Sequence, residues 1–406
     1  MSWSPKKRIY LDYASATPVH PKAARAFNEA SHEYANPGAI HSDGVAAKRI
    51  LTDARERIAF HMGCKARELI FTSGLTEANN IALVGFARML ELQNRSLQST
   101  HWIVSSIEHS SVLECFAEIE RMGGTVSYAE PDANGIIRPE HVAQLLRPTT
   151  VAVSIGWANN EIGTVQPLSS IGLILRTYEK THHTRILFHS DAGQAPLYRS
   201  PQVHSLRVDL LSLGSGKLYG PRGVGCLYLS NRASLRPVIF GGGQERGLRS
   251  GTEDVALAAG FAAALDVVTT ERESEAKRMR KMRDNLAHEI LARISGAVVN
   301  GDLKHALPHM LNISVPRESA GWRTGEYIVL ALDHAGISLS TKSACREGEA
   351  NSHVVEALER ARSAVPSEAL AKEGRAGNTL RFSLGRSTTE SDLKRALAIL
   401  EKVLPN

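Results

Sequence analysis

Residues 209–225 read DLLSLGSGKLYGPRGVG, and this stretch gives the first indication of how the chain is built. The largely apolar residues 210–213 predict a buried strand, which presents Lys217 just before a turn rich in Gly and Pro. A lysine in such an enclosed place can lose its proton and act as an amine nucleophile of the Schiff-base type. A solvated surface lysine is the alternative. A P-loop is excluded, because Leu211 and Leu218 stand where that pattern requires Gly and Ser or Thr.

Strand-like runs alternate with helical segments on both sides of this stretch. The runs that predict strands are residues 8–13, 68–72, 101–105, 124–128, 151–155, 186–190, 210–213 and 225–229. The segments that predict helices are residues 21–34, 44–61, 79–90, 110–121, 139–147 and 168–180. This alternation predicts parallel βαβ units and a doubly wound α/β fold.

The composition and the pattern of the sequence change from about residue 253. An Ala-rich segment leads into a long charged helix near residues 270–293, and shorter strands and helices follow. A chain of 406 residues exceeds one ordinary domain. We therefore expect a large domain over residues 17–265 and a smaller α+β domain built from residues 1–16 and 266–406, with residues 362–377 as a surface insertion.

Composition excludes several classes of protein. Hydrophobic residues make up 43% of the chain and charged residues 22%, which is typical of a soluble globular protein. No apolar run approaches the ~20 residues of a membrane helix, and no secretory signal is evident. The net charge of +6 is scattered rather than concentrated in basic blocks, so no nucleic-acid binding is predicted. The four cysteines lack the spacing of a metal site, so we expect no metal and a reducing cytoplasm.

Polar residues follow several of the predicted strands. Gly74, Leu75 and Thr76 join a strand to a helix, where free backbone N–H groups and the helix dipole favour an anion; a simple helix cap is the alternative. Four further candidates follow other predicted strands: His109, Asn160, Asp191 and Gln194. The histidine can stack on a flat ring, and the two amides and the carboxylate can bind a polar ring. A capping His and a turn-forming Asp are the ordinary alternatives. Because ligands bind at the carboxyl edge of an open α/β sheet, these parts together predict a site for pyridoxal phosphate.

Two residues of the second domain are candidates for substrate chemistry. Cys345 lies in a small, polar stretch between Lys342 and Arg346, and these cations favour its thiolate, which is the nucleophilic form. The planar guanidinium of Arg381 suits bidentate hydrogen bonding to a carboxylate. A surface ion pair is the alternative for an arginine, and Arg386 fits it better. The other three cysteines stand among apolar or helical neighbours, so we interpret them as core residues.

Motifs along nearly the whole chain match one family, in its order. They are YLDYASATPVHP (10–21), NPGAIH (36–41), FTSGLTEANN (71–80), EHSSVL (108–113), NNEIGTVQ (159–166), HSDAGQ (189–194), KLYGPRGVG (217–225), GGGQERGLRSGT (241–252), SAC (343–345) and RFSLGR (381–386). On these motifs the chain resembles the cysteine desulfurases of the NifS/IscS type, in class V of the pyridoxal-phosphate enzymes of fold type I. The resemblance implies a large domain with a mostly parallel seven-stranded sheet, a smaller α+β domain and a homodimer.

The resemblance also implies roles for individual residues. Lys217 would bind the cofactor covalently and move protons, and His109 would stack on its ring. Asp191 would bind the ring nitrogen, and Gln194 and Asn160 would lie near the ring hydroxyl. Phosphate would be held by the segment Gly74, Leu75 and Thr76, by Ser215, and by Thr252 from the other subunit. Cys345 would take the sulfur of L-cysteine as a persulfide and release L-alanine, while Arg381 and Asn36 orient the substrate carboxylate. A sulfur acceptor or iron–sulfur scaffold protein is the implied partner.

The chain departs from the family pattern in places. Gly214 and Gly216 stand where the family usually has Ser and His before the lysine, and Lys342 replaces a small Gly before Ser-Ala-Cys. Many IscS-type members use an extended C-terminal tail for scaffold binding, and we expect this chain, which ends at Asn406 shortly after its last predicted helix, to lack it. Two other functions are therefore weighed. A selenocysteine lyase need not use Cys345, and a degenerate paralogue acting as a binding subunit would lack the yellow colour of the bound cofactor.

Overall fold

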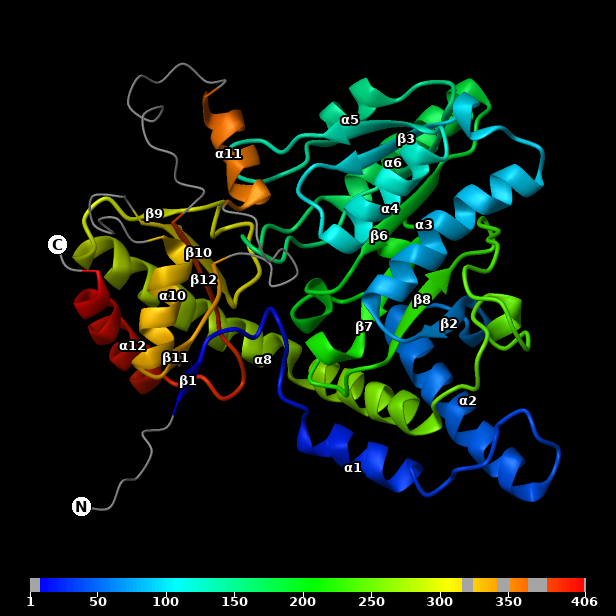
Figure 1. Cartoon of the computed structure of the whole chain (residues 1–406), viewed down its shortest axis with the longest axis horizontal. Coiled ribbons are helices and arrows are strands. Elements are labelled where there is room, and N and C mark those ends of the chain that lie inside the picture. Colours follow the sequence, from blue (N-terminus) through cyan, green and yellow to red (C-terminus); the bar gives the residue numbers. More distant parts are fainter. Residues whose placement is uncertain (1–7, 316–323, 342–350, 364–377, 405–406) are drawn as a thin grey trace.

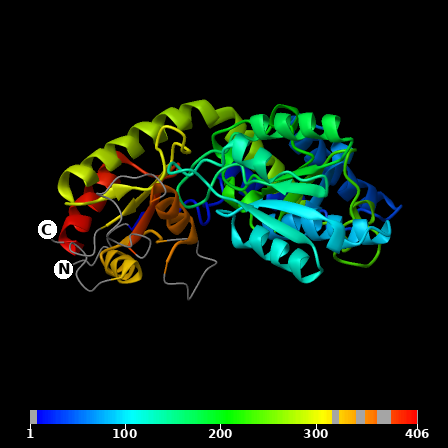
Figure 2. The ribbon, with the colours of Figure 1, turned by 90° about the horizontal axis from the view of Figure 1, so that it is seen from above.

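The computed structural model describes residues 8–315, 324–341, 351–363 and 378–404. These residues form two lobes, and the long helix α8 (Val255–Arg293) runs through both of them (Figure 1). Figure 2 shows α8 lying along one side of the molecule, from the large lobe to the small one. The Ala-rich segment and the charged helix expected after it are thus one continuous helix. The boundary that we place at residues 265/266 falls inside this helix.

The large lobe is built on a seven-stranded sheet with the order β2-β8-β7-β6-β5-β3-β4. Only β8 runs antiparallel to its neighbours, so the expectation of a mostly parallel sheet is confirmed. Its strands lie close to the predicted runs: β2 (Leu69–Thr72), β3 (His101–Ser105), β4 (Thr125–Ala129), β5 (Thr150–Ser154), β6 (Leu187–Asp191), β7 (Leu210–Gly214) and β8 (Gly225–Leu229).

Helices cover both faces of this sheet. They are α2 (Ser42–Met62), α3 (Leu75–Leu92), α4 (Ser110–Arg121), α5 (Pro139–Leu145), α6 (Leu168–His182) and the short α7 (Val203–Leu206), while α1 (Pro21–Ala30) packs against α8. The apolar side chains of α3 and α4 form one buried cluster with one face of the sheet, and those of α2, α6 and α8 form a second cluster with the other. Neighbouring strand residues such as Leu210 and Leu211 enter opposite clusters, as the alternation of side chains along a strand requires.

The small lobe is an α+β unit. Its antiparallel sheet has the order β12-β10-β9, formed by β12 (Thr379–Ser383), β10 (Met310–Ser314) and β9 (Val298–Val299). The strand β1 (Ile9–Tyr10) pairs with β11 (Ile337–Ser338), so the first described residues lie in this lobe before the chain enters the large one. Its helices are α10 (Gly325–His334), α11 (His353–Ser363) and α12 (Glu390–Val403).

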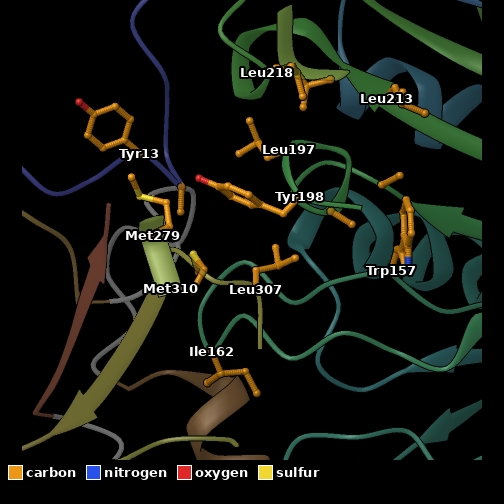
Figure 3. Packing of buried hydrophobic residues seen from close by; sticks show 14 of the residues in the cluster. Tyr13, Trp157, Ile162, Leu197, Tyr198, Leu213, Leu218, Met279, Leu307 and Met310 are labelled. Atoms are coloured by element: carbon orange, nitrogen blue, oxygen red, sulfur yellow. The ribbon is translucent and has the colours of Figure 1, made fainter. Parts of the chain in front are cut away.

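Buried apolar side chains join the two lobes. Figure 3 shows Tyr198 and Leu197 of the large lobe beside Met279 of α8 and Met310 of the small lobe. The Tyr198 ring also lies 4.8 Å from the ring of His309, which is fully buried. The lobes therefore share a continuous core, which holds the loops of one against the edge of the other.

Candidate cofactor and substrate site

A cavity of about 220 Å³ lies at the edge of the sheet where the parallel strands β3, β5, β6 and β7 end. Its walls come from the segments that follow these strands, from the start of α3 and from the N-terminal segment. They are Ser15, Leu75, Thr76, Ser105, Ile107, Glu108, His109, Ser111, Gly156, Ala158, Asn159, Asn160, Gln166, Asp191, Gly193, Gln194 and Lys217. The structure therefore brings together the residues that the sequence placed at one edge of the sheet.

Lys217 reaches this cavity from the turn after β7. The residue is half-buried, and its Nζ atom donates to the carbonyl oxygen of Ala14 at 2.9 Å. The N-terminal segment also binds the residues on both sides of Lys217. Oγ1 of Thr17 donates to the Gly216 carbonyl and accepts from the backbone N–H of Tyr219. The lysine amine is thus in an enclosed position, not on the solvated surface.

Gln194 shares the Ala14 carbonyl with the lysine. Its Nε2 atom donates to that oxygen at 2.8 Å. Its Oε1 atom is buried and accepts no hydrogen bond from the part of the chain that the structure describes. A buried polar atom without a partner is costly, so this oxygen indicates that a donor from a bound molecule belongs beside it.

Asp191 stands at the end of β6 with both carboxylate oxygens engaged. Oδ1 accepts from the backbone N–H of Gly193 at 2.8 Å, and Oδ2 accepts from Nδ2 of Asn79 at 2.7 Å. The first bond is the turn contact that an ordinary Asp makes. The second comes from a buried residue of α3, which holds the carboxylate at the cavity wall.

His109 combines two functions. It is the N-cap of α4, since its Nδ1 atom accepts from the backbone N–H of Ser111 at 3.1 Å. The capping interpretation of this histidine is therefore right. The same residue lines the cavity, so the cap also fixes where the imidazole ring stands.

Glu108 is a wall residue that our sequence analysis did not single out. Only 6% of it is exposed, and Oε1 accepts from the backbone N–H of Gly156 at 2.7 Å. Burial raises the pKa of this carboxyl to about 8, and the nearby charge of Asp191 adds to the effect. Its only sequence signal is its place before the histidine in EHSSVL. The cavity therefore holds one carboxyl that favours its neutral form near neutral pH.

The start of α3 forms the end of the cavity suited to an anion. Gly74 is the N-cap and makes no side-chain cap, so Thr76 lies inside the first turn and is not the cap residue. Leu75 and Thr76 line the cavity, where the free N–H groups of a helix start favour a phosphate.

The structure does not bring Ser215 into this cavity. Its hydroxyl is buried and has no hydrogen-bond partner among the described residues. A Cβ atom on Gly220 would lie 2.0 Å from this hydroxyl oxygen, so the side chain is directed toward Gly220. The expected phosphate contact of Ser215 therefore has no support from this geometry.

Other predicted residues lie outside the cavity of their own chain. Asn36, between α1 and α2, and Thr252, before α8, are both exposed and are not wall residues. Arg381 is 1% exposed and lies behind the wall, where Nη1 donates to the Asn160 carbonyl. The surface ion pair expected for Arg386 is present, with Glu271. Cys345, Lys342 and Arg346 fall outside the described residues.

The remaining cysteines behave largely as expected. Cys115 and Cys226 are buried, and Cys64 is partly buried against the core. Burial raises the pKa of the Cys64 thiol to about 12, and that of Cys115 likewise to about 12. These thiols therefore stay protonated and unreactive near neutral pH.

The described residues fit pyridoxal phosphate. An amine, a carboxylate, a histidine and a helix start surround one cavity, and Gln194 offers a buried acceptor without a partner. Within the described ranges, no cluster of three His, Cys, Asp or Glu side chains is placed to hold a metal ion. The same ranges contain no helix that is both long and apolar enough to cross a membrane.

Comparison with known proteins gives one consistent family. The model of the "Aminotransferase class-V" family matches residues 9–396. A cysteine desulfurase IscS of Dictyoglomus turgidum is 37% identical over 98% of this chain and 95% of its own length. The cysteine desulfurase IscS 1 of Archaeoglobus fulgidus is 35% identical over 97% of this chain and 96% of its own. Among solved structures, a NifS-like protein superimposes with a TM-score of 0.85 at 31% identity, covering 98% of this chain and 99% of that one.

Proposed function

This chain belongs to the class-V aminotransferase family and is a pyridoxal-phosphate-dependent cysteine desulfurase, and we propose which role each residue of the site has in that reaction. The observation that carries the proposal is the meeting of Lys217, Asp191, His109 and Gln194 around one cavity. Pyridoxal phosphate, when bound, supplies an electron sink for bond cleavage at the substrate amino acid.

Each wall residue has a role that follows from its position. Lys217 would hold the cofactor through Nζ and move protons at the substrate, because it is the amine that opens onto the cavity. Asp191, held by Asn79 and Gly193, would fix the proton on the ring nitrogen. His109 would stack on the ring, and the acceptor atom of Gln194 would bind near the ring hydroxyl, with Asn160.

The phosphate would bind at the start of α3. Gly74, Leu75 and Thr76 provide backbone N–H groups and one hydroxyl there. Thr252 would reach the same phosphate from a second subunit, since it is exposed and lies outside its own cavity. Ser215 remains a predicted phosphate ligand that would have to turn away from Gly220 to act.

The sulfur step would use residues of the small lobe. The thiolate of Cys345 would take the sulfur atom of L-cysteine as a persulfide, and L-alanine would leave. Arg381, and Asn36 together with Asn160, would orient the substrate carboxylate. The persulfide would then pass to an acceptor protein, for iron–sulfur cluster assembly or for thiolation of tRNA or cofactors.

A homodimer is supported by large apolar side chains that are exposed on the large lobe. Phe60 on α2 is 79% exposed and Phe240 is 69% exposed. Their segments are adjacent, because Arg55 of α2 donates from Nη1 to Glu245 at 2.7 Å. Large apolar side chains in solvent favour burial against a partner. The free thiols of the described cysteines support a reducing, cytoplasmic setting.

The test is the visible absorption spectrum of the purified protein before and after addition of L-cysteine, with Lys217→Ala and Cys345→Ala as comparisons. We expect a band that Lys217→Ala lacks and that responds to L-cysteine, with sulfide and L-alanine formed only when Cys345 is present. A protein that stays colourless and inert with added pyridoxal phosphate would refute the proposal. Release of selenium from selenocysteine without Cys345 would instead favour a selenocysteine lyase.

A further inference from the structure

Both Nη atoms of the Arg381 guanidinium already donate to groups of the protein. Nη2 donates to Oδ1 of Asp12 at 2.7 Å and to Oγ of Ser15 at 2.7 Å, while Nη1 donates to the Asn160 carbonyl at 3.0 Å. Ser15 in turn donates to the same Oδ1 atom at 2.9 Å. Arg381 of β12 therefore contacts two residues of the cavity wall directly, Ser15 and Asn160, and Asp12 bridges it to Ser15.

This arrangement leaves no free bidentate edge on the arginine. A guanidinium has two such edges, one made by Nε with Nη2 and one by the two Nη atoms, and each uses one hydrogen of Nη2. Nη2 already donates to two acceptors, Asp12 and Ser15. Nε is buried without a partner among the described residues, so it is a donor still to be satisfied. A ligand carboxylate can complete an edge with Nε only by displacing one of the two partners from Nη2.

We propose that Asp12 competes with the substrate carboxylate for Nη2 of Arg381 and thereby sets how tightly the enzyme holds an α-amino acid. This inference rests on the proposed use of Arg381 in substrate binding. In the resting enzyme the aspartate holds the guanidinium at the wall. When substrate enters, its carboxylate exchanges with Asp12, and Nε gains the partner that it lacks.

Charge decides which of the two partners leaves. Arg381 is 1% exposed and its cationic head is compensated by one carboxylate, whose side chain is 18% exposed. A second carboxylate beside Asp12 would place two negative charges on one cation in a poorly solvated place, which is unfavourable. Asp12 has access to solvent and keeps the hydroxyl of Ser15 after exchange, so its departure costs less than that of a fully buried anion.

The experiment compares two ligands that differ only in the carboxylate. L-Alanine and ethylamine are titrated into the enzyme loaded with pyridoxal phosphate, and the change in cofactor absorption gives each dissociation constant. Asp12→Asn keeps the shape and the accepting oxygen but removes the charge. We expect it to bind L-alanine about tenfold more tightly than wild type, with no comparable gain for ethylamine. Glu271→Gln, which breaks the Arg386–Glu271 pair, is the matched control and should leave the ratio of the two constants within about twofold.

The outcomes separate this inference from the proposed function. An unchanged ratio in a folded Asp12→Asn protein would overturn it, as would a larger gain from Ser15→Ala than from Asp12→Asn. Asp12→Ser serves if asparagine prevents folding, which the melting temperature reports. Neither ligand contains sulfur, so the ratio can be read even if the enzyme forms no sulfide from L-cysteine.

Discussion

Leu75 fills the space beside Gly214. A Cβ atom on Gly214 would lie 2.8 Å from Cγ of Leu75, and one on Gly193 would lie 2.7 Å from its Cδ1. Real Cβ atoms do not approach other atoms so closely. The leucine at the start of α3 therefore requires glycine at the end of β7 and just past the end of the neighbouring β6, and the departure from the family's usual Ser before Gly-His-Lys has a steric reason.

We predict that Gly214→Ser weakens the enzyme although it restores the family's usual residue. The new side chain would press on Leu75, and overpacking of this kind costs roughly 1–3 kcal/mol of stability. Because Leu75 belongs to the helix start that would bind phosphate, we expect the dissociation constant of pyridoxal phosphate to rise about tenfold. Fluorescence titration of the cofactor-free protein measures it.

A double variant gives the control for that prediction. Leu75→Ala with Gly214→Ser should recover most of the lost affinity, since the two side chains share one space. Gly216→Ser should be milder, because the nearest atom to a Cβ there is Cγ of the Arg222 side chain, at 3.2 Å. Tighter cofactor binding by Gly214→Ser alone would contradict the prediction.

Lys217→Ala should remove the visible absorption band of the bound cofactor without unfolding the protein. The Ala14 carbonyl would lose the lysine but keep the Nε2 donor of Gln194. Loss of one hydrogen bond whose acceptor retains a partner costs about 1 kcal/mol, which for a chain of this length is a shift of only about 1 °C in melting temperature. A spectrum and a melting curve on the same sample check both parts, and a band that persists would refute the assignment of the lysine.

Glu108→Gln should change how stability depends on pH. The folded-state pKa of about 8 lies above the ordinary value of 4.5, so between these values the folded chain keeps a proton that the unfolded chain has lost. The stability contributed by neutral Glu108 is therefore complete below pH 4.5 and is lost as the pH rises toward 8.

Glutamine lacks this titration. Relative to wild type, the free energy of unfolding of Glu108→Gln should rise by roughly 3 kcal/mol between pH 5.5 and pH 7.5. Urea unfolding of the cofactor-free proteins at the two pH values measures the difference. The exposed Glu273→Gln is the control. If the difference in unfolding free energy between Glu108→Gln and wild type changes with pH as little as it does for this control, Glu108 is ionised in the folded protein.

Phe240→Glu should separate the proposed dimer. A charge at position 240 opposes burial of this exposed side chain against a partner, and Thr252 would then no longer reach a partner's phosphate site. Sedimentation velocity should report monomers at micromolar concentration, with pyridoxal phosphate bound about tenfold more weakly. Leu330→Glu on α10, where the side chain is 68% exposed, is the control. A dimer that dissociates only in this control would place the interface on the small lobe.

Much of the large lobe could be predicted from local pattern. Apolar runs of strand length alternate with helical segments, and the strands lie at these runs. The reason is that a sheet covered on both faces needs strands that are apolar on both faces. The same pattern located Lys217, Asp191 and His109, since each stands at or just after the end of a strand and parallel strands end at one edge. Glu108 was missed because a carboxyl beside a histidine gives no sign of its own burial.

The direction of other side chains depended on contacts between distant segments. Ser215 follows the same strand as Lys217, but its hydroxyl lies against Gly220, and Ala264 of α8 is also close to that glycine. Arg381 has the fork expected of a carboxylate ligand, but Asp12, 369 positions earlier in the chain, occupies it. No local pattern reveals such a partner.

The sequence by itself therefore determined the order of strands and helices, the edge of the sheet that carries the site and the family of the enzyme, because all three follow from residue types at short spacing. Only the tertiary structure decided which donors are occupied, which carboxyl is neutral and which glycine makes room for Leu75. These properties depend on burial and on atoms within about 4 Å of one another, and only folding brings such atoms together.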